Sequence, residues 1–185
     1  MGILRPSPVP YLTDQEYSDL KFSERVLHVA RSQVGLEEIP RGSNSGKHCM
    51  KWLASCNIDY PAYWCAAFGT WCMVEAGLPR EALPHGEMAS STLEWIRWAE
   101  RKKLVVADPH RGCAGVVNTG RGGHYTLICE VKPKSIRTIE GNTNDDGSRD
   151  GYGVFERERT VGYYRSYKYH AFIDMDRIAA LGGIQ

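Results

Sequence analysis

Cys65 is the residue of this sequence whose setting points most directly to chemistry. It stands in the segment Trp-Cys-Ala-Ala-Phe, at the start of an apolar run that ends at Gly77 and Pro79. An apolar run closed by glycine and proline is typical of a buried helix, so we expect Cys65 near its first turn, where backbone N–H groups lack partners. A free thiol titrates near pH ~8.5, and a helix N-terminus or a nearby histidine favours the thiolate. The pattern predicts a cysteine nucleophile.

An imidazole, a carboxylate and an amide that would serve such a thiol follow far downstream, in Gly-His-Tyr and Glu-Gly-Asn motifs. They flank a predicted turn between two strand-like runs. If Val131 lies opposite Ile136, the antiparallel register places His124 opposite about position 143, and a shift of one to three residues places it opposite 140 to 142. Glu140 and Asn142 are two residues apart and are expected on one face of their strand. The hairpin therefore predicts all three groups at one end of a sheet.

The same residues have simpler explanations. Cysteine is among the residue types most often buried, so Cys65 could belong to the core, as we expect for Cys72 and Cys129. His124 could be an exposed residue at a strand start, and the Glu-Gly-Asn motif could cap a turn. The glycines before His124 let another backbone approach closely, and acidic and amide groups face it across the turn. Those two features favour the functional interpretation.

Composition excludes several classes of function. A chain of 185 residues with 42% hydrophobic and 24% charged residues is typical of one folded domain. The net charge of +1 and the absence of a basic stripe argue against nucleic-acid binding. No run of about eighteen apolar residues predicts a membrane span. Six cysteines without a CxxC pair argue against zinc. The tract 141–147 has part of a calcium-loop composition without its ligand spacing, so calcium stays open, and no cofactor is expected.

The pattern of elements predicts an α+β fold in which helices come first and antiparallel strands second. Residues 1–12 are expected to form an irregular arm, and 13–185 a single domain. A capping box at Thr13–Glu16 opens a helical stretch that ends at Gly35, and a second capping box begins at Ser91. Helices are expected over 13–35, about 47–56, 65–76 and about 91–103. Strands are expected at 115–117, 125–131, 135–140, 153–157 and 163–173.

Taken together, the motifs resemble the NlpC/P60 superfamily, most closely its CHAP-like branch of peptidoglycan amidohydrolases. The matching segments are 30–35, 37–38, 44–46, 64–68 with Trp71, 76–79, 123–125 and 139–142. The family usually has Gly-Asp ahead of an apolar strand that precedes the histidine. The corresponding stretch here, 109–117, lacks that aspartate, which leaves the geometry of this strand open.

The resemblance implies a papain-like fold in which N-terminal helices pack on a C-terminal antiparallel sheet. It implies that Cys65 is the nucleophile, that His124 is the base and that Glu140 orients the imidazole. Asn142 becomes an additional polar member of the catalytic site. Three further residues within or next to the matching motifs are expected to bind substrate: Asn44, Trp64 and Tyr125.

The function that the resemblance implies is hydrolysis of an amide bond in the peptide of bacterial peptidoglycan, without a metal or cofactor. The enzyme would be a cysteine peptidase or an N-acetylmuramoyl-L-alanine amidase, and the sequence leaves the choice between amidase and endopeptidase open. Cell wall degradation of this kind is bacteriolytic. Two alternatives remain: a cysteine protease or deamidase with a protein substrate, and a non-catalytic wall-binding module.

The N-terminal segment has three prolines within residues 1–10 and no apolar core of a signal peptide. We therefore expect synthesis in the bacterial cytoplasm without a Sec signal, with the thiols mostly reduced. A wall substrate then requires delivery to the periplasm or cell wall, either as a phage lysin or as an antibacterial toxin exported by a secretion system. The toxin interpretation implies an immunity protein that inhibits the enzyme.

Overall fold

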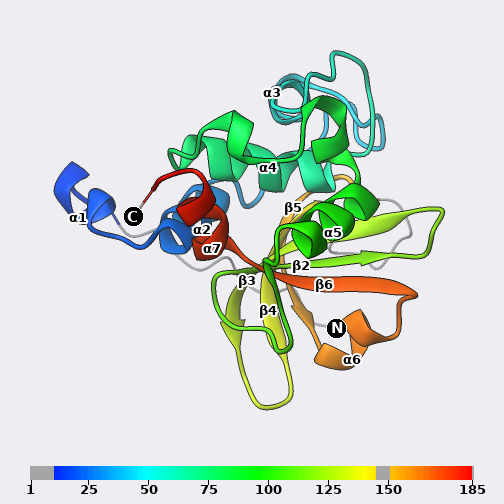
Figure 1. Cartoon of the computed structure of the whole chain (residues 1–185). Helices are drawn as coiled ribbons and strands as arrows, with labels where there is room; N and C mark the ends of the chain where they lie inside the picture. The colour runs from blue at the N-terminus through cyan, green and yellow to red at the C-terminus, as the bar shows by residue number, and fades with distance from the viewer. Residues whose placement is uncertain (1–10, 145–150, 185) are drawn as a thin grey trace.

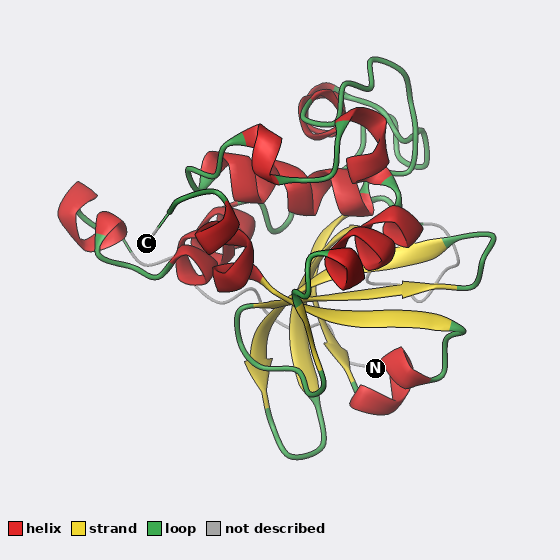
Figure 2. Cartoon of the chain, viewed as in Figure 1, coloured by secondary structure: helices red, strands yellow, loops and turns green. Residues whose placement is uncertain are grey.

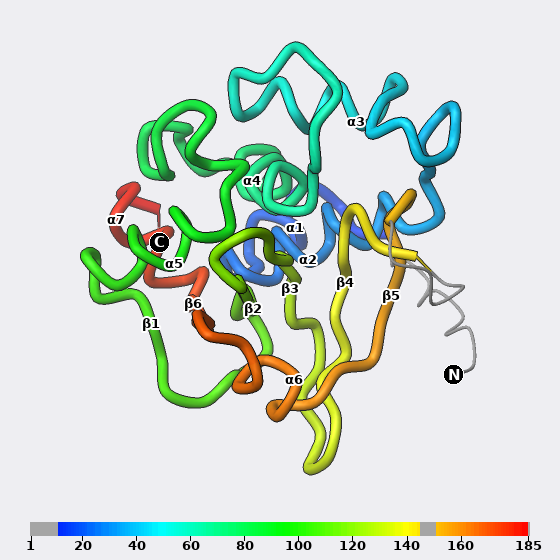
Figure 3. The backbone as a smooth tube through the Cα atoms, turned by 90° about the vertical axis from the view of Figure 1, so that its right-hand side faces the viewer, coloured from blue at the N-terminus to red at the C-terminus, as the bar shows by residue number. Residues whose placement is uncertain are grey.

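In the computed structural model, which describes residues 11–144 and 151–184, six strands form one antiparallel sheet (Figure 1). The strand order is β1-β6-β2-β3-β4-β5, and the strands can be followed in that order across Figure 3. The strands are β1 (Val105–Val106), β2 (Cys113–Asn118), β3 (Gly123–Val131), β4 (Ile136–Thr143), β5 (Gly153–Arg159) and β6 (Tyr169–Asp174). The sheet therefore places β3 and β4 side by side, with β5 at the edge next to β4.

Most helices lie on one side of this sheet, and α6 lies on the other (Figure 2). The α-helices are α1 (Asp14–Ser18), α2 (Phe22–Ser32), α3 (Lys47–Ala54), α4 (Cys65–Glu75), α5 (Thr92–Arg101), α6 (Val161–Arg165) and α7 (Met175–Leu181). Two short 3₁₀ helices connect α4 to α5, namely η1 (Arg80–Ala82) and η2 (Gly86–Ser90). The predicted α+β class is confirmed; α1 to α5 precede the strands as expected, whereas α6 lies between β5 and β6 and α7 follows β6. No helix among the described residues is long and apolar enough to cross a membrane.

Helix α4 is the central element of the helical layer, because residues 65–73 are all buried. It packs against β3 and β4 on one side and against α2, α3 and η2 on the others. Small residues allow this close approach. A Cβ on Gly69 would overlap the ring of Tyr125 in β3, and a Cβ on Gly141 in β4 would lie 2.7 Å from atoms of Phe68 and Trp64. The two glycines therefore set the distance between the Cys65 helix and the strands.

The opposite face of the sheet has its own smaller core. Ile128, Ile136 and Phe172 pack there against Tyr164 of α6, and the Tyr164 hydroxyl lies 2.8 Å from Oγ1 of Thr126. The strand expected over 163–173 is therefore partly wrong. Residues 161–165 form a helix, capped by the side chain of Thr160, and the strand begins only at Tyr169.

The hairpin between β3 and β4 has the predicted starting register, with Val131 opposite Ile136. A β-bulge at residues 128–130 then shifts the pairing by one residue, so that Leu127 lies opposite Ile139. Continued in that register, His124 falls opposite position 142, within the expected range. The helix expected over 13–35 is two helices, interrupted after Ser18. Residues 1–10 of the expected arm and residues 145–147 of the calcium-like tract lie outside the described residues.

Candidate active site

Cys65 is the first residue of α4, as the sequence predicts. The N-cap residue Trp64 provides no side-chain cap, and the Phe68 N–H donates to the Trp64 carbonyl at 2.8 Å. In the described part of the chain, no acceptor takes the N–H groups of Cys65, Ala66 and Ala67. The first turn of α4 therefore presents unpaired N–H donors and the positive end of the helix dipole beside the Cys65 thiol.

His124 is the second residue of β3 and lies next to this thiol. Its Nε2 is 2.8 Å from Oε2 of Glu140, and its imidazole is also hydrogen-bonded to the Cys65 side chain. Because Glu140 holds Nε2, the nitrogen left for Sγ is Nδ1. Burial alone would lower the pKa of His124, but the charge of Glu140 and the two hydrogen bonds outweigh it and raise the pKa to about 10. The imidazole is therefore protonated at neutral pH.

Glu140 is fully buried and is held by donors on three sides. Thr138 Oγ1 donates to Oε1 at 2.6 Å, while Arg159 donates from Nε to Oε1 at 2.9 Å and from a terminal nitrogen to Oε2 at 2.7 Å. Burial would raise the pKa of Glu140, yet the charges and hydrogen bonds of His124 and Arg159 keep it well below its usual range. The carboxylate is therefore ionised and is fixed in one orientation toward the imidazole.

Arg159 is a member of the site that the sequence did not reveal. It stands at the end of β5, its side chain is 21% exposed, and its guanidinium lies 4.7 Å from the centre of the Tyr163 ring. Arg159 follows Glu140 by 19 positions, and other arginines lie near it in the sequence. No local pattern therefore marks Arg159 as the partner of Glu140. Paired with Glu140 and packed on the Tyr163 ring, Arg159 adds one cation to the thiol–imidazole–carboxylate arrangement.

Asn142 does not share a face with Glu140, and that expectation is wrong. A β-bulge lies between Glu140 and Thr143, and Asn142 has a positive φ of 51°, which breaks the alternation of the strand. With its amide oriented to satisfy its neighbours, Oδ1 accepts the N–H of Trp64 at 3.1 Å and Nδ2 donates to the carbonyl of Gly151 at 3.2 Å. The side chain therefore joins β4 to the N-cap of the Cys65 helix.

Two of the three expected substrate-binding side chains belong to the core. Trp64 is 0% exposed and donates from Nε1 to Oε1 of Glu38 at 2.8 Å, while Tyr125 is 1% exposed and packs on Trp95. Neither side chain is available to touch a substrate, so this expectation is corrected for both. Asn44 is only half-buried, and its N–H donates to Oε2 of Glu38 at 3.0 Å. Glu38, which the sequence analysis missed as a site residue, ties the loop before α3 to Trp64.

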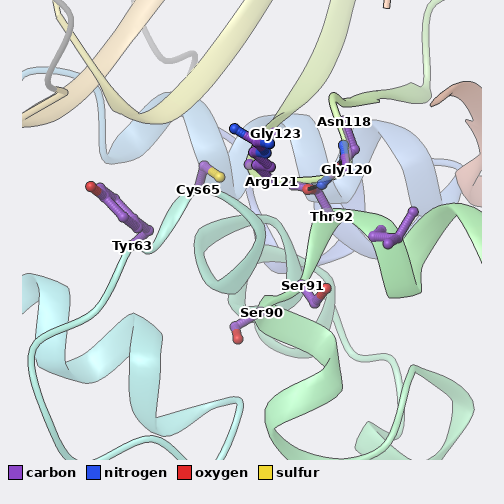
Figure 4. Close-up of a pocket in the computed structure, with 11 residues that line it drawn as sticks. Tyr63, Cys65, Ser90, Ser91, Thr92, Asn118, Gly120, Arg121 and Gly123 are labelled. Atoms are coloured by element: carbon purple, nitrogen blue, oxygen red, sulfur yellow. Dashed lines mark hydrogen bonds between the residues drawn. The ribbon is translucent and has the colours of Figure 1, made fainter. Parts of the chain in front are cut away.

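A cleft of about 540 Å³ opens at Cys65. Its lining comes from three segments: Tyr63 and Cys65 at the start of α4, residues 90–93 at the start of α5, and Asn118 with residues 120–123 at the turn from β2 to β3. Figure 4 shows Tyr63 on one side of Cys65 and the 118–123 segment on the other. A second hollow of about 340 Å³ shares residues 121–123 with this cleft and is lined by His124. The thiol and the imidazole are therefore each reached from the surface.

These observations define a thiol–imidazole–carboxylate site at a helix N-terminus, on an α+β scaffold whose six-stranded sheet is antiparallel throughout. Comparison of the chain with protein-family models, with curated proteins and with solved structures gives no match. Its function is therefore argued from the site itself.

Iodoacetamide at pH ~6 is expected to modify Cys65 and to spare the other five cysteines. Cys65 is 7% exposed and lines the cleft, whereas the others are at most 1% exposed. Burial also raises the pKa of the thiols of Cys49, Cys113 and Cys129, to about 12, 11 and 11. Peptide mass spectrometry after brief labelling checks this. His124→Gln should slow the labelling at least about tenfold; an unchanged rate would show that the imidazole does not activate the thiol.

Proposed function

We propose that this protein is a cysteine-dependent hydrolase that cleaves an amide bond in the peptide of bacterial peptidoglycan. The observation that carries the proposal is the pairing of Cys65, at the uncapped start of a buried helix, with an imidazole whose far nitrogen is held by the buried Glu140. A base that is hydrogen-bonded to a nucleophile and is itself oriented by a third group is the arrangement that acyl transfer requires.

The proposed fold is papain-like, of the NlpC/P60 and CHAP type. Support comes from a helix that begins with the nucleophile and packs on an antiparallel sheet, with the base and its orienting acid on the adjacent strands β3 and β4. The resemblance of the motifs at 64–68, 123–125 and 139–142 points to the same family. The strand β2 forms with all its residues buried although the usual Gly-Asp is absent.

In the first half of the proposed reaction, the proton of the Cys65 thiol already resides on Nδ1 of His124 at neutral pH, as a thiolate–imidazolium pair, and the thiolate Sγ attacks the amide carbonyl. Glu140 stabilises the imidazolium and fixes its orientation through Nε2. The unpaired N–H groups at the start of α4, that of Cys65 among them, donate to the oxyanion of the tetrahedral intermediate. His124 then protonates the leaving amine as the C–N bond breaks, which leaves an acyl group on Sγ.

In the second half, water that has entered the cleft loses a proton to His124 and attacks the thioester carbonyl. The acid is released, and the proton taken from water stays on His124, which restores the thiolate–imidazolium pair. Residues of the described chain supply every proton transfer. The same chemistry would serve an amidase or an endopeptidase, because both reactions form and hydrolyse one acyl-enzyme.

The proposal extends to the place of action. As a wall hydrolase, the protein would act in the periplasm or cell wall after delivery by a secretion system, as an antibacterial toxin, or during phage lysis. An immunity protein that covers the Cys65 cleft is the partner that the toxin interpretation calls for. Expression with an added periplasmic signal peptide should then lyse Gram-negative cells, and co-expression of such an inhibitor should protect them.

Digestion of purified Gram-negative sacculi tests the function. The wild-type chain is expected to release soluble muropeptides whose masses identify the cleaved bond, and Cys65→Ala, which controls for contaminating hydrolases, is expected to release none. Sacculi left unchanged by the wild type would refute a wall substrate. If Cys65 were nevertheless labelled rapidly at pH ~6, the cysteine protease or deamidase alternative would take its place. If it were not, the non-catalytic binding module would.

A further inference from the structure

The cleft at Cys65 is polar but carries a single charge. Of the described residues that line it, Arg121 is the one with an ionised side chain at neutral pH, and no carboxylate is among them. Arg121 is exposed, and no acidic group in the described part of the chain forms a salt bridge with it. By contrast, Arg111 and Arg159 are each paired with a glutamate. The cleft therefore offers an unneutralised guanidinium to whatever enters it.

The backbone that carries Arg121 is held by a local network. Asn118 Nδ2 donates to Oγ1 of Thr92 at 2.7 Å, and Asn118 Oδ1 accepts the N–H of Gly120 at 2.6 Å. The N–H of Arg121 in turn donates to Oγ1 of Thr119 at 3.2 Å. Two polar side chains of the cleft, those of Asn118 and Thr92, are thus occupied in fixing the loop. Because the side chains of Asn118 and Thr92 are hydrogen-bonded to each other, the Arg121 guanidinium is the polar group that this side of the cleft leaves free.

Arg121 also stands where the two hollows of the site meet. The cleft that contains Cys65 and the hollow that contains His124 share Arg121, Gly122 and Gly123. In Figure 4, Arg121 lies beside Gly123, on the side of the cleft toward which the Cys65 sulfur points. A peptide whose scissile carbonyl reached Sγ would therefore pass this side chain whichever hollow its next residue entered.

From these observations, and resting on the proposed hydrolase function, we infer that Arg121 is a specificity-determining residue that binds a free carboxylate of the peptide substrate. A guanidinium is the side chain best suited to this, because its planar fork matches a carboxylate with two parallel hydrogen bonds. Peptides of the bacterial wall carry free carboxylates on residues next to their amide bonds. The site then selects peptides with such a carboxylate and rejects those in which it is amidated.

The test measures binding separately from hydrolysis, with the full chain carrying Cys65→Ala so that ligand is bound but not cleaved. The probes are a disaccharide tetrapeptide released from Gram-negative sacculi by a muramidase and the same compound with its carboxylates converted to amides. The free acid is expected to bind about tenfold more tightly, the lower end of the range for a hydrogen bond to a charged group, because the site is open to solvent. Adding Arg121→Ala should abolish the difference, and Arg121→Lys should restore part of it.

Arg101→Ala is the matched control, since Arg101 is an exposed arginine that lines a different hollow, and it should leave the tenfold ratio unchanged. Equal binding of the two probes, or no binding of either, would overturn the carboxylate site whether or not the wild type digests sacculi. A tenfold ratio that depends on Arg121, in a wild-type chain that cuts no wall amide, would uphold the carboxylate site and refute the proposed hydrolase.

Discussion

In the proposed hydrolase, replacing Cys65 by alanine is expected to lower kcat/KM for a wall peptide by at least about 10⁴-fold, because the proposed acyl-enzyme forms on this thiol. Among the described cysteines, Cys65 alone lines the cleft and contacts His124. The rate of muropeptide release, followed by chromatography, measures the effect. Cys65→Ser should be similarly impaired, since the site is built to pair an imidazolium with a thiolate and a hydroxyl does not ionise there.

Cys72→Ala provides the control for this prediction. Cys72 lies on the same helix two turns further on and is fully buried, and burial raises the pKa of its thiol well above the usual value. The same chemical change should cost about 1 kcal/mol of stability and leave the rate within about twofold. Retention of more than about a tenth of the activity by Cys65→Ala would refute the nucleophile assignment, provided that its thermal unfolding matches the wild type.

Helix starts were predictable because their signals are local. Cys65 opens α4 as expected, and the Ser91 side chain accepts the N–H of Glu94, as its capping box predicts. The start of α7 carries a local signal of the same kind. Asp174 caps this helix through the N–H groups of Asp176 and Arg177, a readable signal that the sequence analysis passed over.

Elements whose type depends on packing were predicted less well. The stretch 13–35 divides because α1 buries none of its residues, while α2 has a buried face that begins at Phe22. The aromatic run after Thr160 has strand-like composition, yet Tyr164 is drawn into the second core and bonds to Thr126, which favours a helical turn. In both places distant contacts decide the conformation, and no local pattern reports them.

The predictions for the site also divide into those that nearby residues determine and those that distant contacts determine. The pairing of His124 with Glu140 followed from the alternation and register of a hairpin, which nearby residues determine. The placement of Asn142 did not, because a bulge and a positive φ turn its side chain toward Trp64. Arg159 reaches Glu140 from the next strand although the register places it opposite Ile136, so strand pairing alone does not predict the contact.

Replacing Glu140 by glutamine is expected to lower kcat by about 10⁴-fold, a loss similar to that of other triads deprived of their acid. The change preserves shape and removes the charge. Without that charge the burial of His124 prevails and its pKa falls from about 10 toward and below its ordinary value. The imidazolium that stabilises the thiolate is then lost at neutral pH. Single-turnover rates measured from pH ~5 to pH ~9 report this loss directly.

The same substitution is expected to destabilise the fold by about 3 kcal/mol, because it leaves the largely buried Arg159 without a carboxylate. Urea unfolding measures this change. Glu158→Gln is the control, since Glu158 is an exposed residue of the same sheet, and it should alter neither the rate nor the unfolding midpoint beyond about 0.5 kcal/mol. A Glu140→Gln variant that kept a third of the wild-type kcat would show that the carboxylate does not orient the base.

The double variant Glu140→Gln, Arg159→Met separates the two roles of this buried pair. If the lost stability comes from an unpaired cation, removing Arg159 as well should recover most of it, because an apolar side chain of similar length replaces the buried charge. Catalysis should not recover, since the imidazolium still lacks its partner. Recovery of both would mean that Glu140→Gln acts through a disturbed fold alone. Recovery of stability without activity would show that Arg159 serves the site by holding Glu140, while Glu140 itself governs the protonation of His124.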